Sequence, residues 1–175
     1  ALFYFSKWLG DYPYEHCTAV QGPLLAGGGM EYPMITIIGD NILDHKVLDE
    51  IIAHEVGHNW FQSILGSNER DFPWMDEGLN SFYEVRYMKK KYGSDMALPS
   101  KLSQKIGLKM GVRELSYQLS VNRHKDQPIG LHSHDLTSTN YGIMVYMGTP
   151  LMLNGLEAYL GRDSFDELMQ GYYEK

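Results

Sequence analysis

The chain has 175 residues, of which 43% are hydrophobic and 21% are charged, and its formal net charge is −7. These values are ordinary for a globular domain with its own core, and the acidic balance leads us to expect no nucleic-acid partner. No apolar run approaches the ~20 residues that span a bilayer, so we expect no transmembrane segment.

Cys17 is the only cysteine, which excludes an internal disulfide. We expect a soluble protein, and the cysteine count does not decide between a cytoplasmic and an exported one. The chain begins at Ala1 within an apolar and aromatic stretch, without an initiator methionine or a signal peptide. We therefore expect residues 1–175 to be one domain cut from a longer multidomain chain, with any targeting signal outside it.

The first third of the chain predicts a helix and then a small sheet. Residues 2–9 form an amphipathic pattern that closes at Gly10, whereas residues 16–25 and 33–38 are rich in the apolar and β-branched residues typical of strands. Three glycines at 27–29 lie between the strands. They indicate either a close approach of the backbone to another group or a flexible hairpin turn.

Helices dominate the rest of the chain. Asp44 is a plausible N-cap for a helix that runs to about Leu65 and ends at Gly66. A second helix is predicted from about Met75 to Tyr92, with shorter or interrupted helical segments after it near residues 98–107, 112–120 and 140–160. A small sheet followed by helices predicts the α+β class.

Individual residues predict where the last helical segments break and begin. Gly148 and Pro150 predict a break within residues 140–160, and Asp163 predicts the start of a final helix that runs to the C-terminus.

The most informative pattern is His54-Glu55-Val56-Gly57-His58. Residues four apart on a helix project from the same face, so the two imidazoles point toward a common place. Two imidazoles and one carboxylate make a zinc site with a position left open for water, and Glu77, 19 residues after His58, can supply the carboxylate from a second antiparallel helix. Glu55 adjoins the first ligand, where it can take a proton from that water.

A solvated helix face can carry the same five-residue pattern without binding a metal. Here the flanking IIA and NWF make the helix apolar on nearly all sides, so it should be buried. Burying two histidines and a glutamate without a metal or other partners is costly. We therefore favour a metal site over a core of mutually satisfied polar side chains.

Three motifs together resemble the zinc aminopeptidases of the aminopeptidase N type, gluzincins that also include leukotriene hydrolase. HEVGHNW and WMDEGLNSFYE fit that family's His-Glu-x-x-His signature, followed by 18 residues and a Glu. GGGMEYP is similar to its Gly-x-Met-Glu-Asn motif, and VYMGTPLMLNGLEAYLG to its Tyr-x-Lys-Gly helix. The matches cover roughly residues 20–92 and 140–175.

The resemblance implies a thermolysin-like zinc peptidase catalytic domain that holds one zinc ion. By position, it implies that His54, His58 and Glu77 bind the zinc and that Glu55 is the general base. Tyr146 would stabilise the oxyanion, with Tyr141 as the rival candidate by spacing.

The resemblance also implies a substrate, a peptide with a free N-terminus. Glu31 would bind its α-amino group, while the backbone of Gly28, Gly29 and Met30 would run beside it like an added strand. The implied activity is hydrolysis of the N-terminal peptide bond. An endopeptidase on the same scaffold and an inactive binding domain are the alternatives.

The sequence departs from the family at three positions. Tyr32 stands where the family has Asn, Gly148 where it has Lys, and Thr149 where it has Gly. The resemblance also implies two neighbours from the same protein, a β-rich domain before this region and a helical domain after it.

Histidine ligands normally donate their second ring nitrogen to a carboxylate or a carbonyl. Glu84 lies two turns after Glu77 on the same predicted helix face and is our candidate for this role. Asp76 and Asn59 are weaker candidates, and all three fit an ordinary helix surface equally well.

Overall fold

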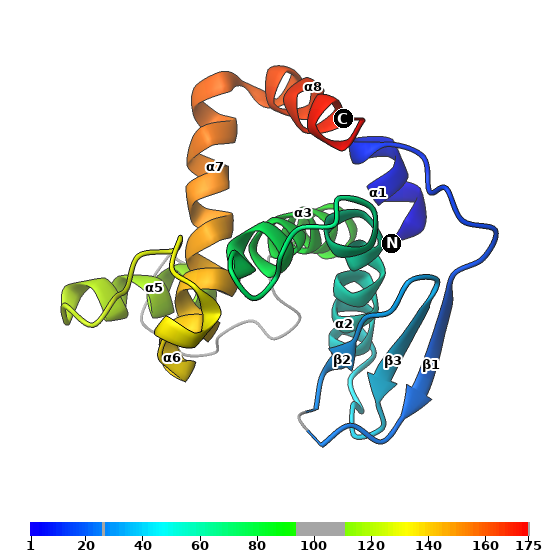
Figure 1. Ribbon diagram of the computed structural model, residues 1–175, viewed down its shortest axis with the longest axis horizontal. Coiled ribbons are helices and arrows are strands. Elements are labelled where there is room, and N and C mark those ends of the chain that lie inside the picture. Colours follow the sequence, from blue (N-terminus) through cyan, green and yellow to red (C-terminus); the bar gives the residue numbers. More distant parts are fainter. Residues whose placement is uncertain (26, 94–110, 175) are drawn as a thin grey trace. The chain divides into compact units, whose positions relative to one another are not determined.

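The computed structural model describes residues 1–25, 27–93 and 111–174 (Figure 1). The chain divides into two compact units. The first unit contains residues 1–66 and 156–175, and the second contains residues 67–155. Among the described residues, no helix combines the length and the apolar composition that crossing a bilayer requires.

The first unit contains the expected small sheet, with strands β1 (Thr18–Gly22), β2 (Gly29–Met30) and β3 (Ile35–Gly39). The strand order is β1-β3-β2, so β3 is central. β1 runs parallel to β3, whereas β2 runs antiparallel to it, with Gly29 opposite Ile38. The central position explains why Thr36 and Ile38 of β3 are buried while β1 is largely exposed.

The helices of this unit are α1 (Leu2–Leu9), α2 (His45–His58), the π-helix η1 (Asn59–Ile64) and α8 (Arg162–Tyr173). The predicted N-cap is confirmed, because the Asp44 carboxylate accepts the amide hydrogens of Lys46 at 2.8 Å and Val47 at 3.0 Å. These bonds lower the pKa of Asp44. The helical path ends as predicted at Gly66, whose φ of 59° is left-handed.

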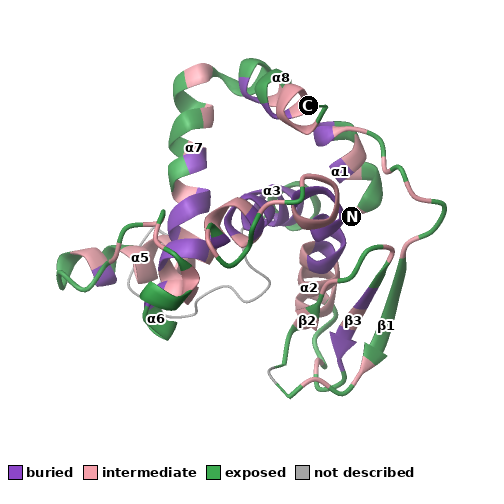
Figure 2. Cartoon of the chain, in the orientation of Figure 1, coloured by how far each residue is buried: buried purple, intermediate pink, exposed green. Residues whose placement is uncertain are grey.

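An aromatic core holds α1, η1 (which continues α2) and α8 together. Phe5, Trp60 and Phe165 are all fully buried, and the Phe5 and Trp60 rings lie 5.5 Å apart. The Trp60 indole also donates a hydrogen bond to the Gly10 carbonyl at 2.9 Å. The second half of α2 is consequently anchored, whereas its first turns are only half-buried (Figure 2).

The described residues of the second unit form helices joined by loops, with no strand among them. Its elements are η2 (Trp74–Gly78), α3 (Leu79–Tyr92), α5 (Val112–Asn122), η3 (Ser133–Asp135), α6 (Ser138–Asn140), η4 (Tyr141–Gly148) and the first part of α7 (Thr149–Leu160). η2 and α3 confirm the predicted second helix, which ends at Gly93 with a φ of 71°. Figure 2 shows α3 buried along most of its length.

The predicted helix at 112–120 is confirmed by α5, while the one at 98–107 lies outside the described residues. The break expected near Gly148 and Pro150 is wrong, because the chain stays helical from Ser138 to Leu160. The π-helix η4 precedes the proline and changes the hydrogen-bond register there. The Thr149 hydroxyl also donates to the Met144 carbonyl at 3.4 Å, which satisfies a backbone acceptor beside the proline.

Candidate metal centre and surrounding site

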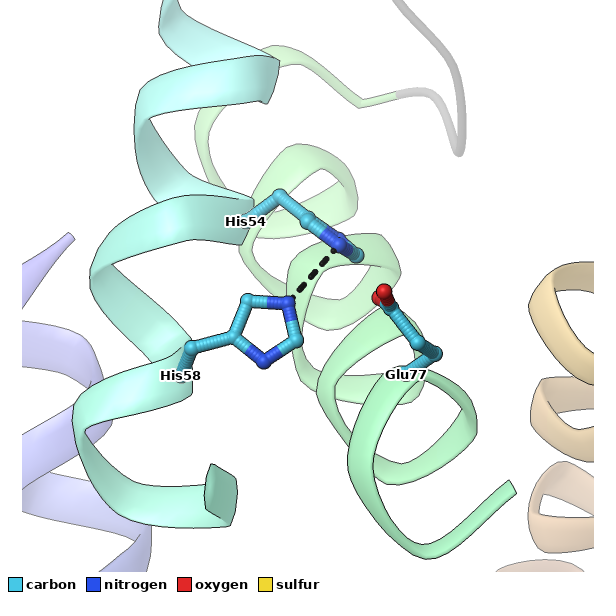
Figure 3. A group of neighbouring side chains, drawn as sticks. All are labelled: His54, His58 and Glu77. Carbon is cyan, nitrogen blue, oxygen red and sulfur yellow. Dashed lines mark hydrogen bonds between the residues drawn. The ribbon is translucent and has the colours of Figure 1, made fainter. Parts of the chain in front are cut away.

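The two motif histidines lie close together on the buried half of α2. Nε2 of His54 and Nε2 of His58 are 3.2 Å apart, and the two rings are nearly perpendicular, at 82° (Figure 3). His58 is 1% exposed and His54 is half-buried. The four-residue spacing therefore brings both ring nitrogens to one place, as predicted from the sequence.

The separation of the two nitrogens fits a shared metal ion. Zinc lies about 2.0–2.1 Å from imidazole nitrogen in tetrahedral sites, which places two such nitrogens roughly 3.3–3.4 Å from each other. The observed 3.2 Å is close to that value. A half-buried site with two converging nitrogens can therefore accept a cation without moving α2.

Glu55, which lies between the two histidines in the sequence, is buried and packs against strand β2. Its side chain is so near Gly29 that a Cβ atom at that position would overlap the Glu55 carboxyl group. This contact resolves the two interpretations of the glycine run, because the backbone at Gly29 does approach another group closely. Glycine at this position leaves the room that Glu55 occupies.

Gly29→Ala is expected to lower the free energy of unfolding by about 1–3 kcal/mol, as is typical when a buried contact is overpacked. The added methyl group must displace either the Glu55 carboxyl group or β2. Denaturant unfolding of the two proteins measures the difference. Gly130→Ala is the matched control, because a Cβ there meets no atom within 4 Å; equal losses in both variants would contradict the steric explanation.

The residues predicted to contact substrate lie on and beside β2. Gly28 has a φ of 71°, and its carbonyl accepts the Gly39 amide hydrogen at 2.8 Å. Gly29 and Met30 form β2 itself, at the edge of the three-stranded sheet. Glu31 follows directly and is half-buried, whereas Tyr32, one of the departures from the family motif, is 50% exposed.

In the second unit, Glu77 and Tyr146 are brought together by η2 and η4. Burial raises the pKa of the Tyr146 hydroxyl well above its ordinary value, and the Glu77 carboxylate, which that hydroxyl hydrogen-bonds, raises the pKa further. Tyr141 contributes a smaller effect, with its ring centre 5.9 Å from that of Tyr146. The Tyr146 hydroxyl therefore stays protonated near neutral pH, as a hydrogen-bond donor must.

Close packing of small residues holds η2 against the helix that follows η4. A Cβ at Gly78, the residue after Glu77, would overlap the buried Thr149 side chain. Gly148, where the family has lysine, packs against Tyr117, because a Cβ there would lie 3.1 Å from the Tyr117 ring. Gly148 and Thr149, which both differ from the family motif, thus have packing roles in this chain.

Glu84 is buried, as a residue supporting the site should be, but its partner within the second unit is a cation. It forms an ion pair with Arg113 of α5, and the Arg113 guanidinium also donates to the Tyr146 carbonyl at 3.1 Å. Sequence reasoning missed Arg113 because nothing in its neighbourhood marks it. The one available signal is that a buried carboxylate on α3 needs a cation. Glu84 as a partner of a ligand histidine stays a prediction.

A helix that carries His-Glu-x-x-His, with an edge strand against its glutamate, defines a candidate metal-dependent hydrolase. The chain belongs to the peptidase M1 family: the family model described as "Peptidase family M1 domain" matches residues 2–175. This membership confirms the resemblance seen in the motifs.

Curated relatives include two fungal proteins named Leucine aminopeptidase 2. The one from Emericella nidulans is 26% identical over 93% of this chain and 26% of its own length. The one from Neurospora crassa is 25% identical over 94% of this chain and 25% of its own length. The chain thus spans about a quarter of the length of these relatives.

Solved structures share the fold. An M1 zinc metallopeptidase from Deinococcus radiodurans, bound to a Tyr-Ser-Ala substrate, matches with a TM-score of 0.71 and 16% identity over 99% of this chain and 35% of that one. Yeast LTA4 hydrolase matches with a TM-score of 0.69 and 20% identity, over 99% and 28%. These likenesses confirm the α+β architecture of an M1 metallopeptidase catalytic domain.

Proposed function

We propose that this chain is the catalytic domain of a zinc aminopeptidase that removes the N-terminal residue of peptides. The observation that carries the proposal is the pair of converging imidazole nitrogens of His54 and His58, 3.2 Å apart, next to the buried Glu55. Family membership and the relatives named as aminopeptidases support the same activity.

The proposed zinc ligands are His54 and His58 of the first unit and Glu77 of the second. Two imidazoles and one carboxylate are a donor set that could hold a metal ion, and Figure 3 draws all three side chains. When bound, zinc would polarise the substrate carbonyl and lower the pKa of a coordinated water toward ~7.

Glu55 is the proposed general base. Its carboxylate would accept a proton from the attacking water and then pass that proton to the departing amine. The side chain is buried and packs against Gly29, so a proton acceptor is restrained on the helix that carries the two histidines. Restricting the carboxylate to one place favours proton transfer because the geometry is set before substrate arrives.

Tyr146 is the proposed stabiliser of the oxyanion. Its hydroxyl remains protonated because burial and the Glu77 carboxylate raise its pKa. A protonated hydroxyl can donate a hydrogen bond to the carbonyl oxygen as that oxygen gains negative charge. The Arg113 bond to the Tyr146 carbonyl restrains the backbone that carries this side chain.

Substrate would be held by β2 and Glu31. An edge strand has backbone groups that can pair with an extended peptide, and β2 occupies the edge of its sheet. The Glu31 carboxylate follows β2 directly and would pair with the substrate's ammonium group. A carboxylate that requires a free amine restricts cleavage to the first peptide bond, which distinguishes an aminopeptidase from an endopeptidase.

Glu31→Gln is expected to lower kcat/KM for free aminoacyl amides by roughly 10–100-fold, as for loss of one charged hydrogen bond, and to leave N-acetylated substrates unaffected. Steady-state kinetics on matched pairs of substrates measure both values. Glu15→Gln changes an exposed glutamate of the same unit and is the control. Equal hydrolysis of free and acetylated substrates by the unmodified protein would favour an endopeptidase instead.

A further inference from the structure

Asn59, the residue directly after His58, is a buried amide whose side chain is hydrogen-bonded at both ends. It is 3% exposed. Its Nδ2 donates to the Val56 carbonyl at 2.9 Å, while its Oδ1 accepts the Met34 amide hydrogen at 3.0 Å and, at 3.5 Å, the Tyr12 hydroxyl. Because an unpaired buried amide atom is costly, these bonds hold the side chain in one orientation.

Met34 is the other half of this contact and has an unusual backbone. Its φ is 66°, in the left-handed region that non-glycine residues rarely adopt. Its carbonyl accepts the Thr18 amide hydrogen at 2.8 Å, and the next amide, of Ile35, bonds the Tyr32 carbonyl at 3.2 Å. The turn is therefore held by β1 on one side and by Asn59 on the other.

This turn begins one residue after Glu31. Before Glu31, the Met30 carbonyl accepts a hydrogen bond from the buried Thr36 hydroxyl at 3.1 Å. Glu31 thus lies between two fixed backbone points. The second point, Met34, is tied through Asn59 to the end of the helix that carries both histidines.

We infer that Asn59 is a positioning residue that sets the place of the Glu31 carboxylate relative to the histidines of α2. The inference rests on the proposed function, in which Glu31 binds the substrate's ammonium group. A fixed spacing between the ammonium site and the histidines selects which peptide bond is cleaved. Without the anchor, the turn can relax toward ordinary backbone angles and carry Glu31 with it.

The test is Asn59→Ala in the zinc-loaded, full-length protein, assayed on a free aminoacyl amide and its N-acetylated counterpart. The ratio of the two kcat/KM values is expected to fall roughly tenfold, mainly through a higher KM for the free amine, with an unchanged zinc content. Tyr12→Phe is the matched control, since it removes the 3.5 Å contact to Asn59 and the bond that the Tyr12 hydroxyl donates to the His16 carbonyl at 2.8 Å, but keeps the Asn59–Met34 bond. It should keep the ratio.

Rescue gives a second test that also serves if Asn59→Ala folds poorly. Glycine adopts a φ of 66° without steric cost, so Met34→Gly added to Asn59→Ala should restore much of the ratio. A purely structural Asn59 would instead lower turnover of both substrates equally and leave their ratio constant.

The positioning role of Asn59 and the amine-binding role of Glu31 can be refuted separately. If Glu31→Gln abolishes the preference for free amines but zinc-loaded Asn59→Ala retains it, the positioning role is overturned and the proposed function stands. If Glu31→Gln retains the preference, the amine-binding role itself is wrong, and the inference about Asn59 falls with it.

Discussion

Glu55→Gln is expected to reduce kcat by roughly 10²–10⁴-fold, the range typical for loss of a general base. The glutamine amide has nearly the shape of the glutamate carboxylate, so the packing against Gly29 should persist. The amide, however, does not accept a proton from water. Turnover of a free aminoacyl amide measures the effect. Elemental analysis of the same sample should find an unchanged zinc content, because Glu55 is not a proposed ligand.

Glu69→Gln is the control for this experiment, because Glu69 is exposed and belongs to no proposed part of the site. Its kcat should equal that of the unmodified protein. Unchanged turnover in Glu55→Gln would refute the general-base role, and absence of turnover in the unmodified full-length protein would revive the interpretation as a binding domain.

His58→Ala is expected to abolish stoichiometric zinc binding and all measurable peptide hydrolysis. The imidazole is almost completely buried and supplies one of two converging nitrogens, so its loss leaves His54 without a partner ligand on α2. A ligand that binds only the folded state stabilises it by about 2.7 kcal/mol at a hundredfold excess over its Kd. A chelator should therefore lower the Tm of the unmodified protein and leave that of His58→Ala unchanged.

His134→Ala is the matched control, since the His134 side chain is 75% exposed on the short helix η3 of the second unit. Its zinc content and its response to chelator should match those of the unmodified protein. Retention of one zinc per chain by His58→Ala would contradict the proposed ligand set, as would a His134→Ala variant that loses the metal.

Local signals in the sequence predicted the elements that carry the site. Asp44 before an apolar periodic run marks the start of α2, and Gly66 and Gly93 mark helix ends, because capping and left-handed backbone are decided by neighbours in the chain. The four-residue spacing of His54 and His58 likewise puts both on one helix face through helix periodicity alone, without any tertiary contact.

Contacts between distant segments could not be predicted in the same way. The sequence offered two interpretations of the glycine run, and only the packing of Glu55 against Gly29 separates them. The ion pair of Glu84 with Arg113 joins helices that are far apart in the chain. The helix continues through Pro150 because the π-helix η4 changes the hydrogen-bond register before it, and no residue type in the sequence signals that change.

The wide π-helical turns also affect how the segments that carry the site residues should be aligned with other sequences and engineered. η1 begins directly after His58, η2 contains Glu77, and η4 contains Tyr146. Each α-helical residue turns the chain by about 100°, so one residue added to or removed from such a segment rotates everything downstream by that angle. A helical wheel drawn straight through residues 138–160 would therefore assign side chains to the wrong faces, and grafting or aligning these segments must preserve their length.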